Sequence, residues 1–145
     1  MTVAYTLITA IAICMIMSLR TLFFPSKWRE KHLSIKNFLL LGISYLVLMI
    51  GFGLVYVLLE VEGVDLLVEE GEVIQGDFLD HLFTCLYFSG VTLFSVGYGD
   101  VTPIGIGRGI ALVESWLGYT IPAAFVIKTF FVDGHRDRPP WKSNG

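Results

Sequence analysis

The sequence has few of the residues that build enzyme active sites and structural metal sites. It contains two cysteines, Cys14 and Cys85, in separate segments, and its three histidines (His32, His81 and His135) are scattered without metal-ligand spacing. It has no phosphate-binding loop, no zinc pattern and no nucleophile spaced to meet a general base. We therefore expect free thiols, no enzymatic activity and no small-molecule substrate.

Charged residues are also scarce, at 16% of the chain, and the formal net charge is −3. A chain of this charge is excluded as a nucleic-acid binder on electrostatic grounds. Apolar residues are abundant instead, at 54% of the chain, and the mean hydropathy is +0.71. Both values lie above those of ordinary soluble domains. The composition predicts a single-domain membrane protein.

Three apolar segments are long enough to cross a membrane, because about 20 apolar residues in a helix span the hydrocarbon core. Residues 3–19 and 37–59 carry no charge, whereas residues 104–132 are interrupted by three charged side chains. The first segment has an alternative interpretation as a signal peptide. However, no basic residue precedes it and no clean cleavage site follows. We therefore expect residues 1–19 to form an N-terminal transmembrane helix.

The distribution of charge predicts the orientation of these segments. Residues 20–36 contain five basic residues and one acid, and the tail at 133–145 adds three basic residues, whereas residues 60–80 contain eight acids and no lysine or arginine. Basic loops remain in the cytoplasm. We therefore expect a basic cytoplasmic interfacial segment at 20–36, a cytoplasmic C-terminus, an extracellular N-terminus and an acidic extracellular loop at 60–80. That loop is either a solvated turn without a specific role or, repeated in several subunits, a surface that attracts cations.

A fourth apolar run, residues 82–94, has only 13 residues, and runs of this length form buried or re-entrant helices. Asp77 or Asp80 is a suitable N-cap for such a helix. The sequence SVGYGD follows at 95–100, where Gly97 and Gly99 can adopt left-handed conformations at little cost. Non-helical backbone at membrane depth is tolerated where it lines a water-filled cavity, and a row of carbonyls facing an axis can replace the hydration shell of a cation. One chain supplies one row, so several chains would be needed.

The stretch TLFSVGYGD, residues 92–100, resembles the selectivity filter of the potassium channel family. The stretch GRGIALVESWLG, residues 107–118, resembles the start of the inner helix in bacterial two-span channels. The resemblance covers about residues 37–132 and implies an all-α membrane protein that forms a homotetramer and conducts K⁺ passively across the cell membrane. Its implied parts are an outer helix at 37–59, an acidic turret at 60–80, a pore helix at 81–94, a filter at 95–100 and an inner helix at 104–132.

The resemblance also implies roles for individual residues. The carbonyls of Ser95, Val96, Gly97 and Tyr98 would coordinate K⁺. The outer mouth would be shaped by Gly99 and Asp100. The Tyr98 ring would turn away from the ion and pack against Tyr87 and Phe88. The alternative, a glycine-rich loop that joins two helices, is disfavoured because the flanking segments match the family as well.

The chain departs from the family at several positions. Ser95 stands where threonine is usual, and Val91 stands where some relatives carry a glutamate that pairs with the filter aspartate. We therefore expect the Tyr87 hydroxyl to bind Asp100 instead. Phe88 supplies only apolar support. These departures keep two other interpretations open, namely a cation channel with poor potassium selectivity and a non-conducting partner subunit or membrane scaffold.

Two features of the third span bear on gating. Gly118 and Pro122, one turn apart, predict a hinge in the inner helix, because an internal proline removes a hydrogen bond and bends the helix. The alternative is a static kink with Gly118 permitting close helix packing. Glu114 is an ionisable residue within the span, and we expect it either to pair with Arg108 or to lie behind the filter. No span carries regularly spaced arginines, which excludes a voltage sensor of the usual kind.

Overall fold

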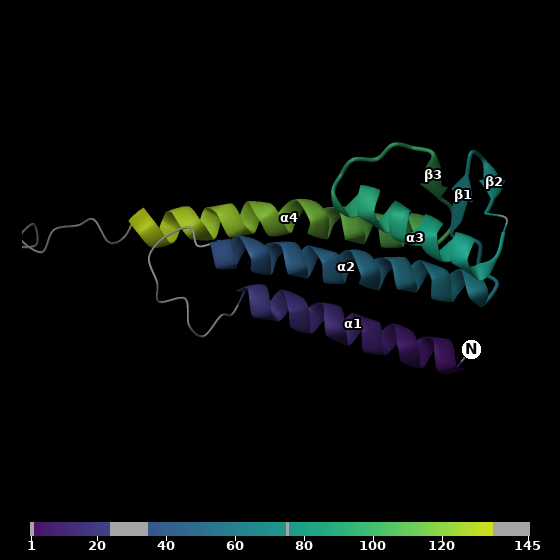
Figure 1. The fold of residues 1–145 in the computed structure, drawn as a ribbon, viewed down its shortest axis with the longest axis horizontal. Coiled ribbons are helices and arrows are strands. Elements are labelled where there is room, and N and C mark those ends of the chain that lie inside the picture. Colours follow the sequence, from purple (N-terminus) through teal and green to yellow (C-terminus); the bar gives the residue numbers. More distant parts are fainter. Residues whose placement is uncertain (1, 24–34, 75, 135–145) are drawn as a thin grey trace, which may run out of the picture.

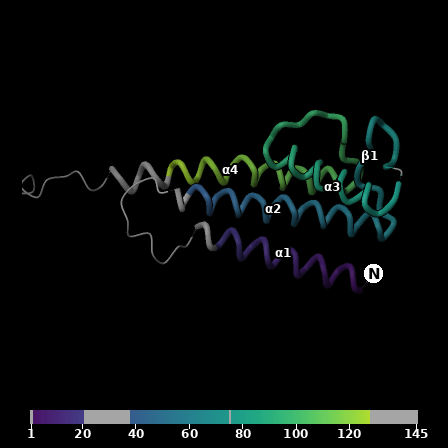
Figure 2. Tube along the Cα trace, in the orientation of Figure 1, coloured from purple at the N-terminus to yellow at the C-terminus, as the bar shows by residue number. Residues whose placement is uncertain are grey.

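The computed structural model describes residues 2–23, 35–74 and 76–134 (Figure 1). Figure 2 shows the same arrangement as a tube along the Cα trace. Within these residues the helices are α1 (Thr2–Phe23), α2 (Ile35–Val61), α3 (Phe78–Leu93) and α4 (Gly107–Gly134), and the short strands are β1 (Leu67–Glu69), β2 (Glu72–Val73) and β3 (Val101–Pro103). Three helices contain segments long and apolar enough to cross a membrane: Thr2–Arg20, Phe38–Val61 and Gly107–Ile127. The predicted helical membrane architecture is confirmed.

The helix α2 lies at the centre of the arrangement, with α1 on one side and α3 and α4 on the other (Figure 1). The strands and the N-terminus lie at one end of the helices, and the end of α1, the start of α2 and the end of α4 lie at the opposite end (Figure 1). Only 11% of the residues in the α1 span are buried, against 33% in α2. The α1 helix is therefore a peripheral element of the single chain, and most of its apolar surface is exposed there.

Two glycines explain how α2 packs against helices on both sides. A Cβ atom at Gly51 would lie 2.6 Å from the Met15 sulfur of α1, and one at Gly53 would lie 3.1 Å from the Leu86 Cα of α3. Residues two apart point to nearly opposite faces of a helix, because each residue turns the helix by about 100°. The two glycines thus allow close approach on both sides, as small residues commonly do between membrane helices.

The pore helix begins earlier and the inner helix later than the sequence predicts. The helix α3 starts at Phe78 with Asp77 as its N-cap, and the Asp80 carboxylate accepts the Asp77 N–H at 3.0 Å. The helix α4 starts at Gly107 rather than at residue 104. The reason is that the Ile104 N–H donates to the Leu66 carbonyl at 2.7 Å, which ties this residue to the turret instead of to the helix.

The acidic segment 60–80 contains two short strands, and most of its described residues are exposed. Both interpretations of its role stay predictions. The first residues of the segment complete α2, and β1 pairs antiparallel with both β2 and β3 in the order β2-β1-β3. Beneath the strands, Leu66 and Leu67 are fully buried and Ile74 is 6% exposed. The turret is therefore joined directly to the strand that follows the SVGYGD segment.

Two predicted segments lie largely outside the described residues. The predicted interfacial segment 20–36 contributes only its ends, since α1 continues to Phe23 and α2 begins at Ile35. The predicted tail 133–145 contributes Asp133 and Gly134, which complete α4. The remaining residues of both segments are outside the described part of the chain.

Candidate functional site

The backbone of the segment 95–100 has a positive φ angle at alternate residues. The angle φ is positive at Ser95 (56°), Gly97 (57°) and Gly99 (83°), that is, at every second residue. Such alternation lets successive carbonyls turn toward one side of the chain. Glycine adopts this conformation at no steric cost, but a non-glycine residue such as Ser95 pays roughly 1–3 kcal/mol for it. The sequence indicated the two glycines and missed the left-handed serine.

The end of the pore helix holds the start of this segment. The Val91 carbonyl accepts the N–H groups of Val96 at 2.8 Å and of Gly97 at 3.2 Å, and the Thr92 carbonyl accepts the Ser95 N–H at 3.0 Å. These bonds satisfy carbonyls that a helix end otherwise leaves without partners. They also place the negative end of the α3 dipole beside the segment, where it favours a cation.

Asp100, at the other end of the segment, is held by two other elements. The Tyr87 hydroxyl of α3 donates to Asp100 Oδ2 at 2.7 Å, which is the contact that the sequence predicts. The Asp100 carbonyl accepts the Glu70 N–H from the turret at 3.0 Å. The hydrogen bond from Tyr87 lowers the pKa of the Asp100 carboxyl, and the same bond raises the pKa of Tyr87 to about 12. The contact therefore favours a charged carboxylate beside a neutral phenol.

The predicted packing of the Tyr98 ring against Tyr87 and Phe88 stays a prediction. Phe88 is buried and meets Tyr56 of α2 edge-on, with ring centroids 5.3 Å apart, whereas the Tyr98 ring is 74% exposed. Tyr87 and Phe88 have different surroundings because successive residues point about 100° apart on a helix. Tyr87 thus faces the filter segment and Phe88 faces α2.

A buried polar network lies behind the pore helix and joins three helices. Glu114 of α4 is 0% exposed, and its carboxyl contacts the Tyr56 hydroxyl at 3.0 Å and the Ser89 hydroxyl. The Ser89 hydroxyl also contacts the Met49 carbonyl at 2.8 Å. We call Tyr56, Ser89 and Glu114 the inner network. Glu114 therefore lies against α3, the predicted pore helix, and its position behind a filter stays a prediction.

Proton counting indicates the state of Glu114. A serine hydroxyl has one proton to donate, and Ser89 faces both the Met49 carbonyl and a Glu114 oxygen. A second proton on the Glu114 carboxyl would make both contacts full hydrogen bonds at once. A neutral acid also avoids the cost of a buried charge. Sequence reasoning missed Tyr56 and Ser89, although polar residues within apolar runs were the available signal.

The site around Gly118 combines close packing with an unusual hydrogen bond. A Cβ atom at Gly118 would collide with the backbone carbonyl of Leu93 at the end of α3, so close packing accounts for this glycine. Pro122 lacks the N–H that would bind the Gly118 carbonyl one turn earlier. The Tyr45 hydroxyl of α2 donates to that carbonyl instead. A hinge at Gly118 and Pro122 stays a prediction.

Arg108 and the two cysteines have simpler surroundings. The Arg108 Nε donates to the Pro103 carbonyl at 3.2 Å, so this side chain secures the junction between β3 and α4. Cys14 and Cys85 are free thiols, as the sequence predicts. Among the described residues, no group of His, Cys, Asp or Glu side chains is placed to hold a metal ion.

Comparison with known proteins identifies a family and two relatives. A family model described as "Ion channel" matches residues 43–132. The chain is 37% identical over 132 residues to "Protein LctB" of Bacillus caldotenax and 36% identical over 132 residues to "Protein LctB" of Geobacillus stearothermophilus. Each match covers 91% of this chain and 98% of the relative, so it must include part of α1. No solved structure matches the chain.

Proposed function

The chain belongs to the ion-channel family, and we propose that it is a potassium-selective channel that conducts K⁺ passively down its electrochemical gradient. The observation that carries this proposal is the alternating backbone of residues 95–99, which is exposed and anchored to the end of a half-length helix. Backbone carbonyls are the ligands that replace the hydration shell of K⁺. In the proposed filter, the carbonyls of Ser95, Val96, Gly97 and Tyr98 hold the ion.

We propose that four copies of the chain surround one pore. A single chain supplies one row of carbonyls, whereas a cage needs several rows. Large apolar side chains beside the filter also lack cover in the single chain: Val96 is 51% exposed and Tyr98 is 74% exposed. The outer half of α4 adds further exposed side chains, namely Leu112 and Trp116. In the proposed tetramer a neighbouring subunit covers the Tyr98 ring, and lipid covers α1.

The proposed orientation places the turret outside the cell. The acidic turret and the N-terminus lie at one end of the helices, and Arg20 near the end of α1 lies toward the other (Figure 1). Basic residues favour the cytoplasmic side. The acidic end therefore faces the exterior, where four copies of the turret attract cations to the pore entrance.

The test is the reversal potential of the purified protein in planar bilayers, with K⁺ on one side and Na⁺ on the other. A reversal at the K⁺ equilibrium potential, with block by barium, is the expected result. Gly97→Ala should abolish the current, because alanine strains the left-handed backbone in the filter. Gly63→Ala is the matched control, since Gly63 also has positive φ (88°) and open space around it but lies in the turret.

One observation favours a second candidate function. Ser95, in place of the usual threonine, lacks the β-branching that stiffens a side chain, so the innermost ion site is looser. The second candidate is a cation channel of low selectivity, and it predicts a current that reverses near zero under the same gradients. A protein that forms tetramers in detergent but carries no current under any condition would instead be a non-conducting subunit.

A further inference from the structure

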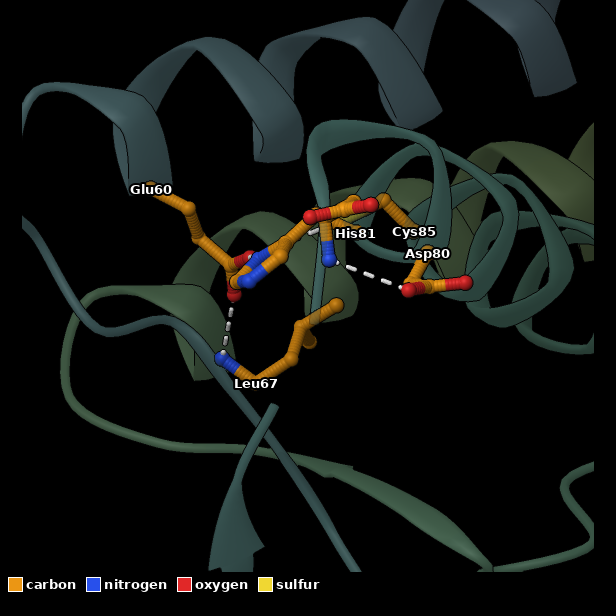
Figure 3. A network of polar contacts seen from close by, with 6 residues as sticks. Glu60, Leu67, Asp80, His81 and Cys85 are labelled. Carbon is orange, nitrogen blue, oxygen red and sulfur yellow. Dashed lines mark hydrogen bonds and ion pairs between the residues drawn. The ribbon is translucent and has the colours of Figure 1, made fainter. Parts of the chain in front are cut away.

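The carboxyl group of Glu60, at the outer end of α2, joins three parts of the structure (Figure 3). Glu60 Oε1 accepts the Leu67 N–H at 3.2 Å, and Oε2 lies 3.1 Å from His81 Nδ1. The Cys85 thiol is 3.7 Å from the same Oε2. The Glu60 side chain is 7% exposed, and that of His81 is 27% exposed. A nearly buried carboxyl is thus held by an imidazole that solvent reaches.

The Glu60 contact to Leu67 connects this carboxyl to the segment that follows the filter. Leu67 is the first residue of β1, and it pairs with Pro103 of β3. On either side of this pair, the Leu66 carbonyl accepts the Ile104 N–H at 2.7 Å, and the Glu70 N–H donates to the Asp100 carbonyl at 3.0 Å. The position of β1 therefore determines the position of the segment that leaves the filter.

We propose that Glu60 and His81 form a proton-responsive brace that positions the outer mouth of the filter through β1. The proposal rests on the proposed function, because it gives the filter an external regulator. Glu60 is the positioning residue, and His81 is the group that senses external pH. Histidine changes charge within the range of pH 5 to 8.

Acidification within this range should strengthen the hydrogen bond between Glu60 and His81. A protonated imidazole makes a charge-assisted hydrogen bond to a carboxylate, and such bonds are stronger than neutral ones. The brace is therefore strongest with imidazolium and carboxylate together and weakens as pH rises and His81 becomes neutral.

The other titratable groups around His81 do not oppose this response. At the start of α3, the Asp80 carboxylate accepts the N–H of the N-cap residue Asp77. Burial and the Glu60 carboxylate raise the pKa of the Cys85 thiol, so it remains a neutral donor. On α2 the facing group is Glu60 itself, and residues 60–80 contain no lysine or arginine. The imidazolium therefore meets only acidic or neutral groups from these elements.

The brace has a readout that is independent of ion conduction. Amide hydrogen exchange of the tetramer in lipid nanodiscs, corrected for intrinsic pH dependence, reports on residues 66–70 and 101–104. In the unmodified protein we expect protection of both segments to be about three- to tenfold higher at pH 6 than at pH 8, since a charge-assisted bond replaces a neutral one. His81→Gln should abolish this difference while the protein stays folded, because His81 is partly exposed.

Two further variants separate positioning from surface charge. Glu60→Gln should lower protection at both pH values and lose the pH response. Glu72→Gln removes one charge from exposed β2 and should keep the response. In bilayers, the current of the unmodified channel should differ between external pH 6 and pH 8, and that of His81→Gln should not.

The outcomes distinguish the two proposals. A pH response of exchange that persists in His81→Gln, or is absent from the unmodified protein, would overturn the brace. So would a loss of response in Glu72→Gln as large as that in Glu60→Gln. A response that follows the predicted pattern in a protein without K⁺ current would support the brace and reject the proposed function. If Glu60→Gln does not fold, His81→Gln alone decides.

Discussion

The pore helix α3 is supported on two sides that differ in their exposure to water. Behind it, the inner network of Tyr56, Ser89 and Glu114 is buried and joins α2, α3 and α4. At its outer end, the Tyr87 hydroxyl binds Asp100, and both residues are exposed in the single chain. Both supports are hydrogen bonds that involve a carboxyl group, so the difference between them is one of environment rather than of chemistry.

Environment decides what each support contributes. A buried polar group that loses its partner cannot turn to water, so it costs the full desolvation penalty. An exposed group finds water at once, and its bond contributes little to stability. The inner network should therefore determine whether the chain folds, while the outer contact adjusts the filter mouth in response to pH and salt.

Substitution of Glu114 should have the largest effect of those considered. Glu114→Ala leaves the Ser89 and Tyr56 hydroxyls without their partner and opens a cavity, and we expect a loss of roughly 3–5 kcal/mol in unfolding free energy. Glu114→Gln keeps a neutral side chain of similar shape and should cost less than about 1.5 kcal/mol. Unfolding in detergent, followed by circular dichroism, measures both. Equal losses for the two variants would contradict a neutral Glu114.

Gly118→Ala should rank next, because the added methyl group meets the backbone of Leu93 rather than a movable side chain. We expect a loss of about 1–3 kcal/mol, the usual cost of overpacking, in the same unfolding measurement. Gly109→Ala is the matched control in the same helix, with open space around the new Cβ. It should stabilise the helix by up to about 1 kcal/mol.

The same pair of variants tests the hinge prediction. If Gly118 acted only as a flexible hinge, Gly118→Ala would alter channel opening and leave stability no lower than in Gly109→Ala. A stability loss confined to Gly118→Ala would indicate that close packing is the main role of this glycine.

Removal of the Tyr45 hydroxyl should have a moderate effect. Tyr45→Phe leaves the Gly118 carbonyl without a donor, and we expect a loss of about 1–2 kcal/mol. Pro122→Ala restores an N–H that can bind this carbonyl within the helix. In the Pro122→Ala background, Tyr45→Phe should therefore cost less than half as much. Equal costs in both backgrounds would show that the hydroxyl does not compensate for the proline.

Sequence reasoning succeeded where the signal is contained in a continuous segment. The membrane spans follow from runs of apolar residues, and the family follows from SVGYGD together with its flanks. The burial of Glu114 against polar groups follows for a similar reason, because a carboxyl within an apolar span must be buried against other polar groups. The contact between Tyr87 and Asp100 was predicted because the filter aspartate needs a hydrogen-bond partner where Val91 replaces a glutamate.

Sequence reasoning failed where the determinant is a contact between distant segments. The strands β1 and β2 have three and two residues, which is too short for an alternating pattern to be visible. The direction of Phe88 depends on the rotation of α3 against α2, which no local pattern specifies. The bond from Tyr45 to the Gly118 carbonyl joins residues 73 positions apart. The reason for this bond, the missing N–H of Pro122, is visible only when Pro122 lies in a continuous helix.

Substitution of Tyr87 should have the smallest effect on folding and a selective effect on the filter mouth. The hydrogen bond from Tyr87 lowers the pKa of Asp100. A lowered carboxyl pKa contributes stability that is complete above the ordinary aspartate range, near pH 4, and that is lost as pH falls through the lowered value. Tyr87→Phe should lack the loss of stability that follows protonation of Asp100. Its unfolding free energy at pH 7 should stay close to that of the unmodified protein.

Current recorded while the external solution is acidified from pH 7 to pH 3 tests this prediction. The unmodified channel should keep its conductance to a lower pH than Tyr87→Phe, because its Asp100 remains charged longer. The acid response of Asp100 is tested apart from that of His81 by recording the same titration in His81→Gln. If Tyr87→Phe destabilised the fold as much as Glu114→Ala does, the distinction between buried and exposed support would be wrong. The exposure of Tyr87 in the single chain would then be removed by a neighbouring subunit in the tetramer.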